Sequence, residues 1–202
     1  MLVRLTMICS GATPATRKGS FPLDEGLEPQ SLALAETMTL RRADRVWTSP
    51  ALRARQTAEA MGLKPSVEPL LAEQDFGRWA GKGFAEVQAL DPDGIAAWLG
   101  DAEAAPHGGE SLAYVAKRVA SLMDGLIQTS GHTIAVTHVG VIRAAIVHVL
   151  GAPLAACRRI DVEPLSLTDL RSDGHRWMLR SSGVPVAKPG KSAGPQSDTP
   201  ET

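Results

Sequence analysis

The sequence predicts an α/β fold with three layers, in which a mostly parallel central sheet lies between helices on both faces. Short apolar runs rich in branched residues alternate with amphipathic segments along the whole chain, which is typical of strands buried on both sides. Several of these runs end in small residues and glycine, where a strand gives way to a loop or helix. A chain of 202 residues with 44% hydrophobic residues is long enough for one domain with a sizeable core.

Charge and cysteine content exclude several classes of protein. The formal net charge is −1, so no strong field attracts nucleic acid or an anionic membrane, and we expect neither as a partner. Cys9 and Cys157 are too few for a disulfide framework, which favours a cytoplasmic protein. The apolar N-terminal stretch is interrupted by Arg4, unlike a signal peptide, and no apolar run is long enough to span a bilayer.

The first apolar run, residues 2–8, is predicted to be a buried strand that ends in Cys9-Ser10-Gly11-Ala12-Thr13. Ligands of α/β proteins bind at the carboxyl ends of the strands, so this loop is the first place to look for chemistry. It offers backbone amides and hydroxyls but no histidine, carboxylate or cation before Arg17. By itself it is a strand-to-loop turn without a catalytic role. Residues 16–27, polar and turn-prone, are predicted to form a surface loop.

The next segment is predicted to form a half-buried helix, a strand and a second helix, over residues 28–40, 44–48 and 51–61. Ser49, followed by a proline, has the residue type that caps the free amides of a helix start. Arg53 lies in the first turn of that helix, where a cation does not suit the helix dipole, so another interaction must favour it.

Residues 67–71 are a weak strand, followed at 72–81 by two carboxylates, two aromatic residues and two glycines. That composition indicates a shaped loop and not a linker. Residues 84–89 and 91–99 are predicted to be a helical turn and a short helix. We expect the insert 85–107 to cover the pocket.

A well-patterned helix begins after Gly108-Gly109-Glu110-Ser111, with apolar residues three and four apart up to Leu126. Residues 133–137 are another buried strand, and 141–150 an apolar helix. His138 lies between them, where a strand meets a helix N-terminus, a position that favours anions. We interpret the other four histidines as structural.

The C-terminal part is predicted to contain three last strands, at residues 158–162, 166–171 and 176–181. Proline, glycine, serine and lysine dominate from residue 184 onwards. The sequence therefore predicts a single domain over residues 1–183 and a disordered tail over residues 184–202.

Three predicted strand ends, at Cys9, Thr48 and Thr137, should meet at one edge of a parallel sheet. A cation, an imidazole and backbone amides together suit a phosphoryl group, and a carboxylic acid nearby could protonate a leaving oxygen. The groups that this convergence would bring together are those of Gly11, Arg53, Glu73 and His138.

Four segments, in order along the chain, resemble the histidine phosphatase superfamily, also called phosphoglycerate-mutase-like. Thr48-Ser49-Pro50-Ala51-Leu52-Arg53 resembles its second phosphate-binding segment, and Leu71-Ala72-Glu73-Gln74-Asp75 opens a stretch similar to its acid–base loop. Gly108-Gly109-Glu110-Ser111 resembles the turn before its long helix, and Val136-Thr137-His138-Val139-Gly140 its second-histidine segment.

The resemblance implies a mechanism that needs no metal or other cofactor. In the family the first strand ends in Arg-His-Gly, and that histidine attacks phosphorus to form a phosphohistidine that water hydrolyses. Two arginines and a second histidine hold the phosphoryl oxygens, and a carboxylic acid protonates the leaving group. By position, Arg53 would be the second arginine, Glu73 the proton donor and His138 the second histidine, while Gly11 and Thr13 keep the pattern of the first phosphate-binding segment.

The first segment departs from the family at its two most reactive positions. Cys9 stands where the family has the phosphate-binding arginine, and Ser10 stands at the position of the nucleophilic histidine. Ala80 also stands where many phosphatases carry a glutamate. Loss of the nucleophile in a well-studied hydrolase lowers turnover by roughly 10⁶. A serine nucleophile would need an adjacent base such as His138, and a buried Cys9 would keep a high pKa.

Two functions therefore remain open. The first is a pseudophosphatase that binds phosphate or a small phosphorylated metabolite with little or no turnover. The alternative is an active metal-independent phosphomonoesterase or mutase, either with an altered mechanism or with Ser10 as an engineered inactivating change. The substrate and the oligomeric state are left open by the sequence.

Overall fold

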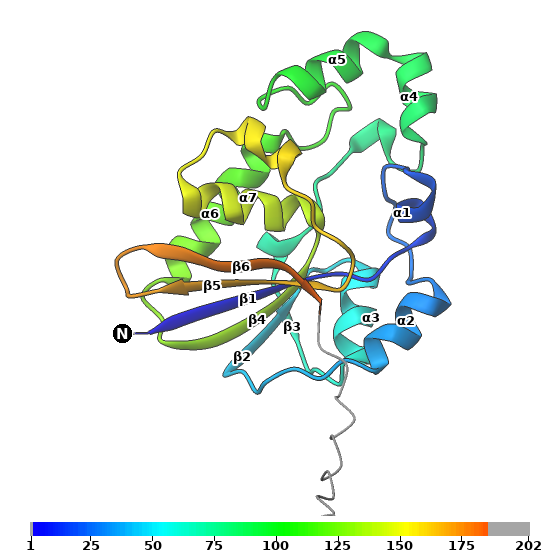
Figure 1. Cartoon of the computed structure of the whole chain (residues 1–202). Coiled ribbons are helices and arrows are strands. Elements are labelled where there is room, and N and C mark those ends of the chain that lie inside the picture. The colour runs from blue at the N-terminus through cyan, green and yellow to red at the C-terminus, as the bar shows by residue number, and fades with distance from the viewer. Residues whose placement is uncertain (1, 186–202) are drawn as a thin grey trace, which may run out of the picture.

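The computed structural model describes residues 2–185 and contains one six-stranded sheet with the strand order β3-β2-β4-β1-β5-β6 (Figure 1). Strands β1 to β4 run parallel, whereas β5 pairs antiparallel with β1, and β6 antiparallel with β5. The strands are β1 (Val3–Cys9), β2 (Arg45–Thr48), β3 (Ser66–Val67), β4 (Gly131–Thr137), β5 (Ser166–Ser172) and β6 (Trp177–Pro185).

Helices cover both faces of this sheet, which confirms the predicted three-layer α/β architecture. In Figure 1, α6 and α7 lie on one face and α2 and α3 on the other, while α4 and α5 stand apart from the sheet. The helices are α1 (Pro14–Lys18), α2 (Pro29–Glu36), α3 (Leu52–Ala60), α4 (Phe84–Leu90), α5 (Pro92–Gly100), α6 (Leu112–Leu126) and α7 (Val139–Leu150), with short 3₁₀ turns η1 (Pro69–Leu71), η2 (Gly77–Trp79) and η3 (Leu154–Arg159). None of the described helices is long and apolar enough to cross a membrane.

Strand β1 is almost continuously apolar because it is buried on both faces. Leu5, Met7 and Cys9 pack into the cluster formed with α6 and α7, and Ile8 packs into the cluster with α2 and α3. Full burial of one such aliphatic side chain contributes about 1.5–3 kcal/mol to stability. The strand is therefore fixed in register, because a slip by one residue would exchange the two clusters.

The register places the ends of three parallel strands at one level. Cys9 of β1 lies opposite Thr137 of β4, and Val136 lies opposite Thr48 of β2. The predicted convergence of strand ends is confirmed, and Ser10 and His138 follow it directly.

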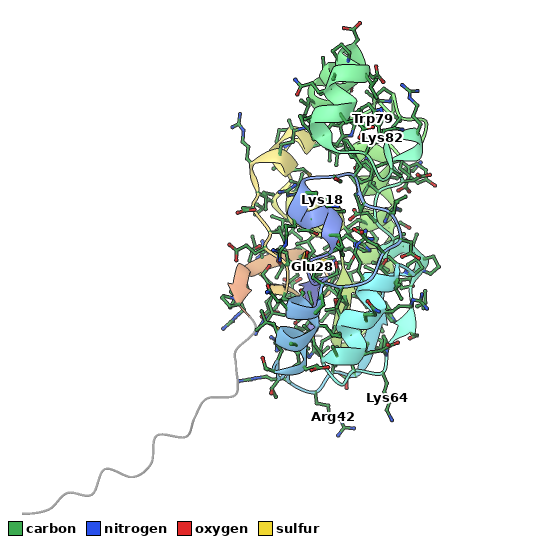
Figure 2. The ribbon with its side chains drawn as sticks, turned by 90° about the vertical axis from the view of Figure 1, so that its right-hand side faces the viewer. Lys18, Glu28, Arg42, Lys64, Trp79 and Lys82 are labelled. Carbon is green, nitrogen blue, oxygen red and sulfur yellow. The ribbon has the colours of Figure 1, made fainter. Side chains whose placement is uncertain are left out.

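A cluster of aromatic rings joins α4 and α5 to the loop after η1. Phe21 lies 5.2 Å from Trp79 and 5.7 Å from Trp98, measured between ring centroids, and Phe76 lies 5.1 Å from Phe21. The ring of His107 lies 5.0 Å from Trp79, in agreement with a structural role for this histidine. Figure 2 shows Trp79 beside α4 and α5, at the end of the molecule opposite Arg42 and Lys64.

The structure corrects several predicted elements. Residues 158–162 do not form a strand, since η3 ends at Arg159 and β5 occupies the position beside β1. Of the predicted weak strand 67–71, only Val67 pairs with β2, together with the preceding Ser66, because a 3₁₀ turn begins at Pro69. Thr13 caps an additional short helix, α1, within the predicted loop.

The predicted domain boundary is two residues too early. Val184 and Pro185 belong to β6 and pair with β5, so they are not part of a tail. The rest of the predicted disordered tail lies outside the described residues.

Candidate functional site

The backbone just after the strand ends continues the sheet for one more step. The Ser10 amide donates to the Thr137 carbonyl over 2.8 Å, and the Ser49 amide donates to the Val136 carbonyl over 2.9 Å. Ser10 and Ser49 therefore lie on opposite sides of the end of β4, where His138 begins the turn into α7. The site is thus built on the ends of the three central parallel strands.

The loop after β1 has each of its amides paired within the protein. The Gly11 amide donates to Thr57 Oγ1 over 2.9 Å, the Ala12 amide to Ser31 Oγ over 2.8 Å, and the Thr13 amide to Thr16 Oγ1 over 3.2 Å. The sequence led us to expect free amides around Gly11 for an anion, whereas the structure gives these amides hydroxyl partners from α1, α2 and α3.

Gly11 and Thr13 each have a clear local role. A Cβ atom on Gly11 would come within 2.5 Å of Ser31 Oγ, so only glycine allows the loop to pack this closely on α2. Thr13 is the N-cap of α1 and forms a reciprocal capping box with Thr16. A role for either residue in phosphate binding stays a prediction.

The structure brings Arg53, Glu73 and His138 together. Arg53 Nη2 donates to Glu73 Oε2 over 3.3 Å, and His138 Nδ1 lies 3.5 Å from the same carboxylate oxygen. Arg53 Nη1 donates to the Leu23 carbonyl over 3.0 Å. Arg53 is only 5% exposed, so these contacts explain a cation in the first turn of α3, where the helix dipole alone would disfavour it.

Ser49 belongs to this cluster and does not cap a helix as the sequence suggested. Helix α3 begins at Leu52 and its N-cap is Ala51, which makes no side-chain cap hydrogen bond, whereas Asp24 Oδ1 accepts the Leu52 amide over 2.7 Å. Ser49 Oγ instead lies 2.7 Å from His138 Nε2 and accepts the Ala51 amide over 3.2 Å.

Burial controls the charge of His138. Desolvation lowers its pKa from 6.5 to about 4, although the Glu73 carboxylate acts in the opposite direction. The imidazole is therefore neutral at pH 7. We assign its proton to Nδ1 because that atom faces a carboxylate, which leaves Nε2 to accept from the Ser49 hydroxyl.

Cys9 and Ser10 lack the surroundings of an activated nucleophile. Cys9 is 2% exposed within the core, and burial raises the pKa of its thiol to about 12, so the thiolate is not formed at pH 7. Ser10 is 6% exposed, and the two ring nitrogens of His138 face Ser49 and Glu73. Among residues 2–185, no hydrogen bond joins Ser10 Oγ to a base of the kind that activates a nucleophilic serine.

Arg118 holds the loop that carries Glu73, and the sequence analysis missed it. Its guanidinium donates to Glu110 Oε1 over 3.0 Å and to the carbonyls of Leu70 and Ala72, over 2.7 Å each. Arg118 is 9% exposed on the apolar face of α6. A cation on the core face of an amphipathic helix is the sequence signal that could have found it.

Two adjoining cavities open beside the cluster. The first has a volume of about 300 Å³ and is lined by Ser49, Arg53 and Glu73, and also by Ala80. The second, of about 210 Å³, lies between α5, α7 and η3. The cavities share four lining residues, and neither is lined by Ser10 or His138. The residues common to both are Pro22, Glu73, Gln74 and Phe76.

The described residues contain no group of three or more histidine, cysteine, aspartate or glutamate side chains that could hold a metal ion. The charged and polar groups gathered at the site are a guanidinium, an imidazole, a carboxylate and hydroxyls.

The parallel sheet carries an arginine, a histidine and a glutamate near its strand ends, and these groups suit a phosphoryl group. The chain matches the histidine phosphatase superfamily (branch 1) over residues 7–184 and belongs to that superfamily. The resemblance carried by the four sequence segments is thus confirmed, and so is the phosphoglycerate-mutase-like fold.

Relatives are named as phosphatases of small molecules. The chain is 31% identical to glucosyl-3-phosphoglycerate phosphatase of Mycolicibacterium vanbaalenii, over 70% of this chain and 76% of that protein. It is 29% identical to the adenosylcobalamin/alpha-ribazole phosphatase of Salmonella typhimurium, over 80% and 86%. The structure of mycobacterial glucosyl-3-phosphoglycerate phosphatase with VO3 is 28% identical, with a TM-score of 0.77 over 90% of this chain and 98% of that one.

We predict that replacing Arg118 with methionine destabilises the protein by about 2–4 kcal/mol, because it leaves a half-buried carboxylate and the carbonyls of Leu70, Ala72 and Glu73 without their donor. Urea unfolding measures the change. Lys117→Met, one residue away on the exposed side of α6, is the matched control and should lie within about 0.5 kcal/mol of the wild type. Equal effects of the two substitutions would contradict the role given to Arg118.

We also predict that His138 makes stability fall in acid. The unfolded chain takes up a proton on this residue below pH 6.5, whereas the folded protein does so only near pH 4. The free energy of unfolding should therefore decrease by up to about 3 kcal/mol across that window. His138→Gln should flatten the slope between pH 6.5 and 4, as followed by urea unfolding at several pH values. Parallel curves for the two proteins would show that the histidine is not buried in its neutral form.

Proposed function

We propose that this chain is a pseudophosphatase, which binds phosphate or a small phosphorylated metabolite with little or no hydrolysis. The observation that carries the proposal is the environment of residue 10. The family resemblance assigns the nucleophile to this position, where the chain has a buried serine whose hydroxyl is not hydrogen-bonded to a base among residues 2–185. A cytoplasmic location is part of the proposal and is supported by Cys9 and Cys157, which are both unpaired.

The retained cluster supports ligand binding more than it supports turnover. Arg53 can donate charge-assisted hydrogen bonds to phosphoryl oxygens, and the neutral His138 can donate one from Nδ1, which has no hydrogen-bond partner among residues 2–185. A bound phosphoryl group must compete with Glu73 for the guanidinium. Cys9 leaves the pocket without the second arginine of the family, and one charge-assisted contact is worth about 1.5–3 kcal/mol. We therefore expect weak binding of phosphate alone.

The alternative is an active metal-independent phosphomonoesterase or mutase that acts on a small phosphorylated metabolite. The names of the relatives favour it, and Glu73 is placed to protonate a leaving group at the edge of both cavities. Such an enzyme would need an altered mechanism, or Ser10 would have to be an engineered inactivating change.

The binding proposal predicts that phosphate and vanadate raise the thermal stability of the protein, while phenyl phosphate is not hydrolysed and no phosphohistidine forms. Ligand at ten times Kd stabilises by about 1.4 kcal/mol. Arg53→Gln should abolish the shift, and Arg55→Gln, exposed on the same helix, should keep it. Metal-independent turnover that Arg53→Gln abolishes would support the alternative, and no shift at millimolar ligand would contradict any phosphate function.

Two further variants test the missing groups directly. Ser10→His should restore at most weak hydrolysis of phenyl phosphate, because Cys9 still leaves the pocket short of one arginine. Cys9→Arg/Ser10→His should exceed the single variant by about tenfold or more, since one recovered contact to phosphate is worth about 1.5–3 kcal/mol. Thermal unfolding of both variants controls for the cost of placing a charge where Cys9 is buried. Full activity from Ser10→His alone would identify residue 10 as the single lesion of an otherwise competent enzyme.

A further inference from the structure

The second cavity differs in charge from the first. Three carboxylates, those of Asp24, Glu73 and Asp75, line the first cavity against the single guanidinium of Arg53. The second cavity reverses this balance, because Arg143 and Arg158 line it against Glu73 alone. An anionic group next to the cluster is therefore favoured on the side of the second cavity.

Arg158 is held in place before any ligand binds. Its guanidinium lies over the ring of Trp98, 5.2 Å from the ring centroid, and donates to the Trp98 carbonyl. It makes no ion pair with a carboxylate of residues 2–185. Stacking and one backbone bond fix the plane of the guanidinium, so little side-chain entropy is lost when it binds a carboxylate.

Arg143 approaches the same cavity from α7. Its Nε donates to the Ile160 carbonyl over 2.7 Å, and the described part of the chain offers it no ion-pair partner either. The other N–H groups of its guanidinium remain for a ligand. Val139 and Gly140, in the first turn of α7, line the cavity beside it.

Apart from Gln74, the remaining walls are apolar. They include the aromatic rings of Phe76 and Trp98. The cavity volume of about 210 Å³ admits a small ring and is too small for a folded partner. Aromatic walls with two guanidinium groups are suited to a planar group that carries an acid.

From this arrangement we propose that the second cavity is a subsite for a planar, carboxylate-bearing part of the ligand, which Arg143 and Arg158 bind through the carboxylate. The inference rests on the proposed function, since it describes what extends from the phosphoryl group at Arg53 and His138. It assigns the ligand to phosphomonoesters of hydroxy acids with a flat body.

Two probes that differ only in the acid test this subsite. Phenyl phosphate and 4-carboxyphenyl phosphate are titrated into the full chain by calorimetry. We expect the carboxylated probe to bind about tenfold or more tightly, as one charge-assisted bidentate contact allows. Arg158→Gln should remove this difference in affinity between the two probes. Arg159→Gln, its exposed neighbour in η3 that does not line the cavity, should behave as the wild type.

The outcomes separate the subsite from the proposed function. Equal affinity for both probes, or a difference that survives in Arg158→Gln and in Arg143→Gln, would overturn the subsite and leave phosphate binding intact. Failure of both probes to bind would overturn the proposed function itself. Loss of binding of both probes in Arg53→Gln, together with loss of only the carboxylate advantage in Arg158→Gln, would support both.

Discussion

The buried guanidinium of Arg118 is the interaction on which the site depends. It joins α6 to the backbone on the N-terminal side of Glu73 and is neutralised by Glu110 at the start of the same helix. Taking this pair out of water is unfavourable, and the carbonyl bonds offset that cost only because their geometry is good. The ion pair of Arg118 and Glu110 therefore fixes the path of the loop that carries Glu73 more than it adds to the net stability of the protein. That path brings one carboxylate within reach of Arg53 and His138, which belong to different elements.

The charges of the cluster are balanced within the protein. Arg53 is paired with Glu73, and His138 is kept neutral by burial. Phosphoryl transfer without a metal needs an excess of positive charge that is not already neutralised, so that developing negative charge is stabilised in place. A balanced cluster is instead suited to exchange, in which a ligand replaces Glu73 on the guanidinium. Arg143 and Arg158, which have no ion-pair partner among residues 2–185, line the second cavity beside this cluster.

The sequence predicted those features that depend on chain-local patterns. Strand ends, the position of His138 before α7 and the unusual placement of Arg53 could all be read from apolar periodicity and helix polarity, and the family motifs added the role of Glu73. Ser49 was misinterpreted, because a serine followed by proline matches a helix cap whether or not its hydroxyl is needed elsewhere. The stacking of Arg158 on Trp98 joins segments 60 residues apart, and local patterns do not encode such a contact.

Hydroxyl groups from other segments hold the backbone of the loop after β1, so the conformation of this loop depends little on its own side chains. Because Ser31 and Thr57 hold the backbone at Ala12 and Gly11, the path of the chain past residues 9 and 10 depends little on what those residues are. For an engineer, this property makes position 10 a place where reactive groups other than histidine can be installed with the loop left intact, whereas Cys9 is packed in the core and tolerates less.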